Sequence, residues 1–209
     1  MRIAVVSCLK YKDCWMPFAE LLKKFWPDCP YPVEWWTDEG TPGASWCEVL
    51  LKHSQNSDDR VLLMLEDFLL TEPVHQELIA EALLLAHHEN ADLVRLFPMP
   101  GADGESINDR FGVITKQAEY RISAQTAIWK ENYLRQIASQ FNDAWEFETE
   151  GTKFSRTIPG HLLSFRRGSG PWPISHLCSG ISRGKWNPDA LKLFEQHGID
   201  VDLSLREVA

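Results

Sequence analysis

Hydrophobic positions near the start of the chain form short runs, separated by a stretch with helical spacing. Residues 3–8, 33–37 and 61–65 are these runs, with Glu34 as their one charged residue, and they predict strands buried on both faces. Between the first two runs, apolar residues recur at helical spacing over residues 13–25, and Pro27 ends that pattern. This order predicts a βαβ unit, so we expect the three strands to be parallel neighbours in one sheet.

The same signals continue along the rest of the chain. Helical spacing predicts further helices over residues 46–53, 74–88, 123–141 and 188–196. Short apolar runs predict further strands over residues 92–97, 111–115, 161–165 and 174–181. Pro188 and Gly198 mark the start and the end of the last helix. The alternation predicts one α/β domain over residues 1–209, a three-layer α/β/α sandwich with a mostly parallel, Rossmann-like sheet.

Composition narrows the function classes. The 209 residues are 44% hydrophobic, enough for a sizeable core, and the net charge of −9 argues against general nucleic-acid binding. The five cysteines are an odd number without a CxxC pair, which signals neither a disulfide framework nor a zinc site. The N-terminal apolar run is too short for a signal peptide, and no run approaches the ~20 residues that span a bilayer. We therefore expect a cytoplasmic protein.

Two adjacent acids, Glu66 and Asp67, follow the apolar run at 61–65. In open α/β sheets, ligands bind at the carboxyl ends of the strands, so these acids are candidate ligand contacts. Asp38 follows the run at 33–37 and joins the candidates for the same reason. The alternative is that Glu66 and Asp67 are only the solvated end of a core strand.

Polar groups in the second half supply further candidates. Arg121 precedes the predicted helix at 123–141, where a helix start and a guanidinium can bind an anion or a sugar hydroxyl. Ser123 is more simply an N-cap. Glu146 and Glu148 lie two apart, so in an extended segment they would share a face while Trp145 and Phe147 point into the core. The alternative for the two acids is an acidic loop without a role.

A basic stretch follows, with the four side chains Arg166, Arg167, Arg183 and Lys185. Arginine forks bind phosphate with two hydrogen bonds, so these residues are candidates for holding an anionic ligand. A solvated surface patch is the alternative.

Taken together, the motifs LEDF, YRISxQxxIW, WEFE and RGKW resemble the GT-A class of nucleotide-sugar glycosyltransferases, in a small bacterial or phage-type subgroup. The resemblance implies a nucleotide-sugar-binding half over residues 1–115 and an acceptor half over residues 116–209. In that class a DxD motif binds Mn²⁺ or Mg²⁺ and the ribose. Here Glu66 and Asp67 take the first two positions and Phe68 the third, so either the two acids hold the metal in a shifted geometry or cationic side chains replace it.

The resemblance also implies a reaction, the transfer of a hexose from a nucleotide sugar to an acceptor hydroxyl. UDP is the expected nucleotide, and the acceptor is a glycan, a protein, a small molecule or a modified base. Glu148, or else Glu146, would be the base of an inverting enzyme. The expected donor contacts are Ser7, Thr37, Asp38, Glu66, Asp67, Arg121, Arg183 and Lys185. The rival functions are a non-catalytic nucleotide-sugar binder and an interaction protein on a degenerate scaffold of this class.

Overall fold

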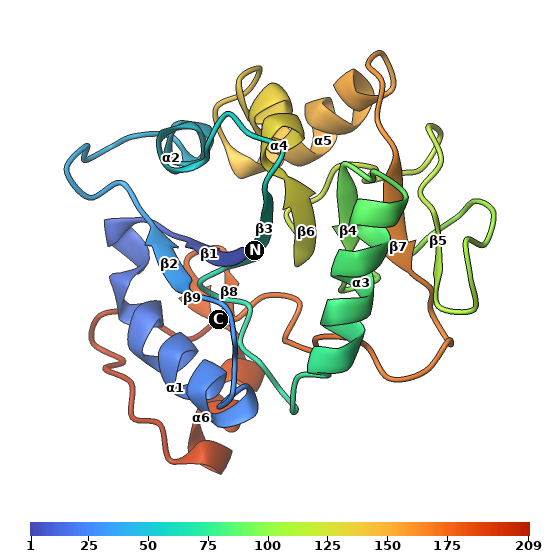
Figure 1. Ribbon diagram of the computed structural model, residues 1–209. Helices are drawn as coiled ribbons and strands as arrows, with labels where there is room; N and C mark the ends of the chain where they lie inside the picture. Colours follow the sequence, from blue (N-terminus) through green and yellow to red (C-terminus); the bar gives the residue numbers. More distant parts are fainter.

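The computed structural model describes residues 1–209 and is built on one seven-stranded mixed sheet (Figure 1). The strands lie in the order β2-β1-β3-β6-β4-β7-β5. Their bounds are β1 Arg2–Val6, β2 Val33–Trp36, β3 Arg60–Leu65, β4 Leu93–Arg95, β5 Phe111–Val113, β6 Ala127–Lys130 and β7 Leu162–Phe165. Only β6 and β5 run antiparallel to their neighbours, so the prediction of an α/β fold with a mostly parallel sheet is confirmed.

The predicted βαβ unit is confirmed. The strand β1 pairs in parallel with β2 on one side and with β3 on the other, and Ile3 lies opposite both Val33 and Leu62. The connection between β1 and β2 holds a 3₁₀ helix, η1 (Leu9–Cys14), and the helix α1 (Trp15–Phe25). The carboxyl ends of three neighbouring strands therefore meet at one edge of the sheet.

Helices cover the sheet on both sides. Their bounds are α2 Trp46–His53, α3 Gln76–His88, α4 Glu131–Ala138, α5 Ala144–Ser155 and α6 Pro188–His197. Side chains of α1, α3 and α6 pack in one hydrophobic cluster, whereas those of α2, α4 and α5 pack in a second. Successive residues of β1 alternate between the two clusters, because neighbouring strand residues point to opposite faces.

The last helix has the predicted ends. Asn187 caps α6, Pro188 is its first residue, and Gly198 follows it in the left-handed conformation with φ of 65°. Glycine favours this conformation because it has no Cβ. The prediction for this helix is therefore confirmed.

The predicted helix over residues 123–141 is wrong in its first half. Residues Ala127–Lys130 form β6, an antiparallel strand inserted between β3 and β4. Trp129 lies opposite both Val61 and Leu93 and is fully buried. A short buried run cannot be told from a buried helical turn by its spacing, and the true helix α4 begins directly after it.

Two predictions of extended structure are also wrong. Residues 145–148 lie in the first turn of α5, where Asp143 is the N-cap, so Phe147 is buried while Trp145 is 66% exposed. Residues 174–181 make one isolated bridge, Leu70 with His176, instead of a strand. Only Ile181–Ser182, named β8, is a strand, and it pairs with β9 (Lys185–Trp186) in a hairpin.

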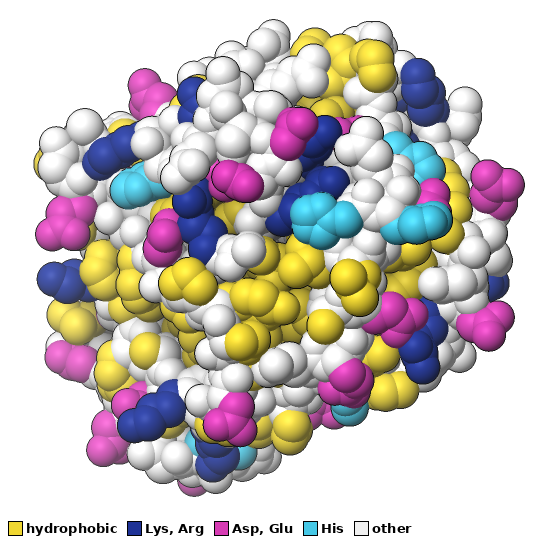
Figure 2. All heavy atoms as spheres, viewed as in Figure 1, with side chains coloured by type: hydrophobic (Ala, Val, Ile, Leu, Met, Phe, Trp, Pro, Cys, Tyr) yellow, Lys and Arg dark blue, Asp and Glu magenta, His cyan; other side chains and the backbone are white.

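The surface mixes hydrophobic and charged side chains. On the face shown in Figure 2, hydrophobic side chains gather in a band across the middle, with charged side chains mainly around it. None of the helices combines the length and the apolar composition needed to cross a membrane.

Candidate functional site

A pocket of about 510 Å³ opens at the carboxyl ends of β1 and β3. Ser7 and Cys8 follow β1 and line one side, while Leu65, Glu66 and Asp67 line the part formed by the end of β3. The two acids and Ser7 are thus brought together at the sheet edge, where the strand pattern predicted the two acids. Ligands of open α/β sheets bind at this edge, so the pocket is the candidate functional site.

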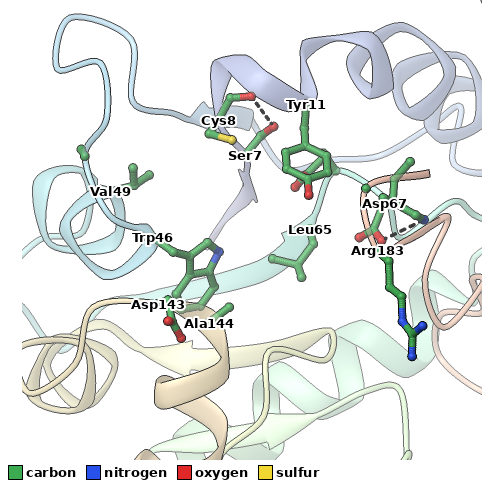
Figure 3. A pocket seen from close by; sticks show the side chains of 14 residues that line it. Ser7, Cys8, Tyr11, Trp46, Val49, Leu65, Asp67, Asp143, Ala144 and Arg183 are labelled. Carbon is green, nitrogen blue, oxygen red and sulfur yellow. Dashed lines mark hydrogen bonds between the residues drawn. The ribbon is translucent and has the colours of Figure 1, made fainter. Parts of the chain in front are cut away.

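Other walls of the pocket come from distant parts of the chain. Figure 3 shows Tyr11 of η1 and Trp46 of α2 on opposite sides of the pocket. Asp143, the N-cap of α5, and Arg183, in the β8–β9 turn, also line it. Sequence reasoning had not assigned Tyr11, Trp46 or Asp143 to a site. The one signal for Tyr11 was its place directly after the first strand, where ligand-binding loops begin.

Hydrogen bonds hold Asp67 against the segment before β8. Its Oδ2 accepts a hydrogen bond from Ser179 Oγ at 2.6 Å and from the backbone N–H of Ile181 at 3.3 Å. The Gly180 N–H donates to the Asp67 carbonyl oxygen at 2.8 Å. A Cβ on Gly180 would lie 2.8 Å from Leu69 Cδ1 and 3.0 Å from that carbonyl oxygen, so a larger residue would crowd both. Asp67 is therefore a fixed group of the pocket.

Glu66 has an unusual protonation equilibrium. Burial and the neighbouring Asp67 carboxylate raise the pKa of Glu66 to about 8. Burial also raises the pKa of Asp67, although the hydrogen bonds from Ser179 and Ile181 oppose that change. Near neutral pH, Glu66 is therefore mainly protonated, and a protonated carboxyl can donate a hydrogen bond as well as accept one.

The strand-end residues Ser7 and Asp38 accept hydrogen bonds from the segment that follows β1. Ser7 Oγ accepts a hydrogen bond from Trp15 Nε1 at 2.7 Å, and Asp38 Oδ1 accepts one from the Leu9 N–H at 2.8 Å, at the start of η1. Thr37 and Asp38 are both buried, and neither lines the pocket. Asp38 thereby ties the end of β2 to the end of β1.

Arg121 lies inside the protein. It is 2% exposed, and its guanidinium donates to the backbone carbonyls of Ile114, Thr115 and Gly160. It does not line the pocket, and no helix starts at Ser123. The argument that placed an anion site at that helix start is therefore wrong.

The two candidate bases lie outside the pocket. Glu148 Oε1 accepts hydrogen bonds from Ser123 Oγ at 3.0 Å and from the Ala124 N–H at 2.7 Å. Its side chain borders a separate hollow of about 380 Å³. Glu146 Oε2 accepts a hydrogen bond from the Asn142 N–H at 3.0 Å, at the start of α5. Because Glu146 and Glu148 lie on a helix, they do not share a face as an extended segment would require.

Of the basic candidates, only Arg183 lines the pocket. It has a φ of 50°, and Gly184 one of 79°, in the tight turn between β8 and β9. Lys185 makes an exposed ion pair with Glu207 at 2.9 Å. Arg166 and Arg167 follow β7, and Arg167 Nε donates to the Pro98 carbonyl at 2.8 Å.

The acids at the end of β3 do not form a metal site by themselves. No three His, Cys, Asp or Glu side chains converge in a geometry that holds a metal ion. Phe68, at the third position of the acidic motif, is buried and stacks on His176 with ring centroids 4.3 Å apart. Because burial and Asp67 raise the pKa of Glu66 to about 8, a metal ion bound here would have to displace the Glu66 proton. A divalent ion here would need further oxygen ligands from substrate phosphates and water.

Comparison with protein-family models and with curated proteins finds no match to this chain.

Proposed function

We propose that the protein is a nucleotide-sugar glycosyltransferase with a three-layer, GT-A-like fold, which transfers a sugar from a UDP-sugar to an acceptor hydroxyl. The observation that carries this proposal is the position of Glu66 and Asp67. They directly follow β3, which pairs in parallel with β1, and they line a pocket of about 510 Å³ together with Arg183. The motif resemblance implies the same position for the acids that contact the donor.

The chemistry of the walls fits the parts of such a donor. Trp46 and Tyr11 offer aromatic faces for the base, and Asp67 offers a fixed carboxylate for ribose hydroxyls. Arg183 supplies the guanidinium that a diphosphate needs. Protonated Glu66 adds no negative charge beside the phosphates.

The acceptor hydroxyl must lose its proton during transfer. Glu148 is the base that the resemblance implies, and it lies on the helix whose N-cap, Asp143, lines the pocket. Glu148 lies five positions after Asp143, which corresponds to about 7.5 Å along the helix axis. Its carboxylate borders the neighbouring hollow, so an acceptor would have to extend from the pocket along α5 to bring its hydroxyl to Glu148.

A non-catalytic nucleotide-sugar binder is the second candidate. Two observations favour it: Phe68 replaces the third acid, and the Glu148 carboxylate already accepts hydrogen bonds from Ser123 and Ala124. Both functions require donor binding, and only the first requires turnover.

A thermal-shift screen of UDP and UDP-sugars, with and without Mn²⁺, tests donor binding. A ligand at about 100 times its Kd should add about 2.7 kcal/mol to the free energy of unfolding. Asp67→Ala should lose this gain, whereas Glu150→Gln, which alters an exposed ion pair on α5, should retain it. Slow release of free sugar from the bound UDP-sugar would identify an enzyme. A chain that no UDP-sugar stabilises would contradict the proposal.

A further inference from the structure

Arg206, near the C-terminus, joins two segments that form the pocket. Its side chain is buried, and its Nε and Nη2 donate to the two carboxylate oxygens of Asp13 at 2.7 and 2.8 Å. Nη1 donates to the Gly184 carbonyl at 2.8 Å, and Nη2 donates to the Lys10 carbonyl at 3.2 Å. One guanidinium thus connects η1 to the turn between β8 and β9.

Both connected segments carry residues of the pocket wall. Tyr11 lies between Lys10 and Asp13 in η1, and Arg183 precedes Gly184 in the turn. The Arg206 guanidinium carbon is 4.6 Å from the centroid of the Tyr11 ring, a distance typical of a cation–π contact. Arg206 therefore backs the Tyr11 ring and fixes the turn that presents Arg183.

The chain around Arg206 is itself held in place. The Trp186 N–H donates to the Glu207 carbonyl at 2.8 Å, and the Ala209 N–H donates to the Trp186 carbonyl at 2.9 Å. The last residues thus extend the β8–β9 hairpin, and Trp186 also faces the Arg206 guanidinium at 5.7 Å. This backbone pairing sets the position from which Arg206 reaches η1.

We propose that Arg206 is a positioning residue of the nucleotide-binding pocket, which sets Tyr11 and Arg183 at the separation that a nucleoside diphosphate requires. The identity of the ligand rests on the proposed function, whereas the positioning rests on the contacts of Arg206 alone. A planar fork can bond the two Asp13 oxygens and the Gly184 carbonyl together, and a lysine ammonium cannot reproduce that geometry. Arg206→Lys should therefore keep the charge and lose the positioning.

The test measures UDP affinity by calorimetry in a double-mutant cycle. Arg206→Lys should weaken UDP binding about tenfold, and Arg110→Lys, a matched change at the exposed ion pair with Glu81, should leave it unchanged. Tyr11→Ala should cost clearly less affinity in the Arg206→Lys background than in the wild type, because the ring is already misplaced there. Equal costs in the two backgrounds would show that Arg206 does not act through Tyr11, and would overturn the proposal.

Hydrogen exchange in the ligand-free protein separates this inference from the proposed function. The amides of Tyr11 and Trp186 are bonded to the carbonyls of Cys8 and Glu207, and both should exchange faster in Arg206→Lys. If the wild type does not bind UDP, the proposed function is wrong. Hydrogen exchange then becomes the only test of whether Arg206 positions η1 and the β8–β9 turn. Unchanged exchange at both amides would then overturn the role of Arg206.

Discussion

Protonation of His176 should destabilise the folded protein. The ring is stacked between Phe68 and Phe97, with centroid distances of 4.3 and 4.0 Å. Nδ1 lies 2.6 Å from the Leu177 carbonyl, and Nε2 lies 2.9 Å from Thr126 Oγ1. A neutral ring satisfies both partners, since Nδ1 donates to the carbonyl and Nε2 accepts from the hydroxyl. Burial lowers the pKa of His176 to about 4.

The sign and size of the change in the free energy of unfolding follow from the linkage between folding and the protonation of His176. The unfolded chain has a histidine pKa of about 6.5, so between pH 6.5 and pH 4 it binds a proton that the folded protein does not. The free energy of unfolding therefore falls as the pH falls through this window. The pKa difference corresponds to about 3 kcal/mol in full, and to about 2 kcal/mol at pH 5.

Urea unfolding at pH 7.5 and pH 5.0 measures this loss. The comparison is between the wild type and His176→Phe, which keeps an aromatic ring in the stack and cannot titrate. Other titrating groups are common to both proteins, so their contributions cancel in the difference between the two pH slopes. His87→Gln, at an exposed position at the end of α3, should keep the wild-type slope.

The reasoning about His176 depends on the difference in slope and not on absolute stability. His176→Phe is expected to be less stable at pH 7.5, because the Leu177 carbonyl and the Thr126 hydroxyl lose a partner. Equal pH slopes for the wild type and His176→Phe would show that the buried ring does not resist protonation, and would refute the reasoning.

The remaining predictions concern the pocket and its supports. UDP affinity, measured by calorimetry, should fall about tenfold from pH 7 to pH 9, because a Glu66 with a pKa of about 8 loses its proton over this range. Glu66→Gln should remove that dependence, and a persistent dependence would assign it to another group. Glu148→Gln should lower the transfer rate by about 10²- to 10⁴-fold at unchanged UDP affinity, whereas near-normal transfer would point to Glu146 instead. Gly180→Ala should lower the free energy of unfolding by about 1–3 kcal/mol, because its Cβ would crowd the Asp67 carbonyl, and unfolding at the wild-type urea concentration would contradict that.

The buried parallel strands could be predicted from the sequence because both of their faces are covered. Residues 3–6 and 61–65 are apolar without interruption, and the structure places them in the neighbouring buried strands β1 and β3. Residues 33–36 include Glu34 and form the edge strand β2, whose first two residues are exposed. The apolar character of a buried strand also led to the wrong prediction for β6. Its run Ala127-Ile128-Trp129 continues directly into the apolar spacing of α4, so the strand was predicted as helix.

The candidate site was predictable only where its residues follow strands. Glu66 and Asp67 follow a predicted strand, line the pocket and could be found from the strand pattern. Arg206 could not be found in this way, because its partner Asp13 lies 193 residues away in the chain and only tertiary packing brings them together.

Trp46 and Asp143 are two further pocket residues that the sequence alone could not assign. Trp46 is the first residue of α2, and Asp143 is the N-cap of α5. Both line the pocket because of how these two helices pack on the sheet. Helix spacing predicts which residues are buried, but it does not say which helix end lies over which strand. Local patterns therefore give the elements, whereas the composition of the pocket depends on their packing.

The most direct test of the proposed donor site is a calorimetric titration of UDP into the wild type, Asp67→Ala and Trp46→Ala. The structure predicts one saturable site in the wild type and affinity at least about tenfold weaker in each variant, because one loses the fixed carboxylate and the other an aromatic wall. Wild-type binding that both variants retain would place the nucleotide elsewhere. No binding by the wild type would contradict the assignment of this pocket to a nucleotide sugar.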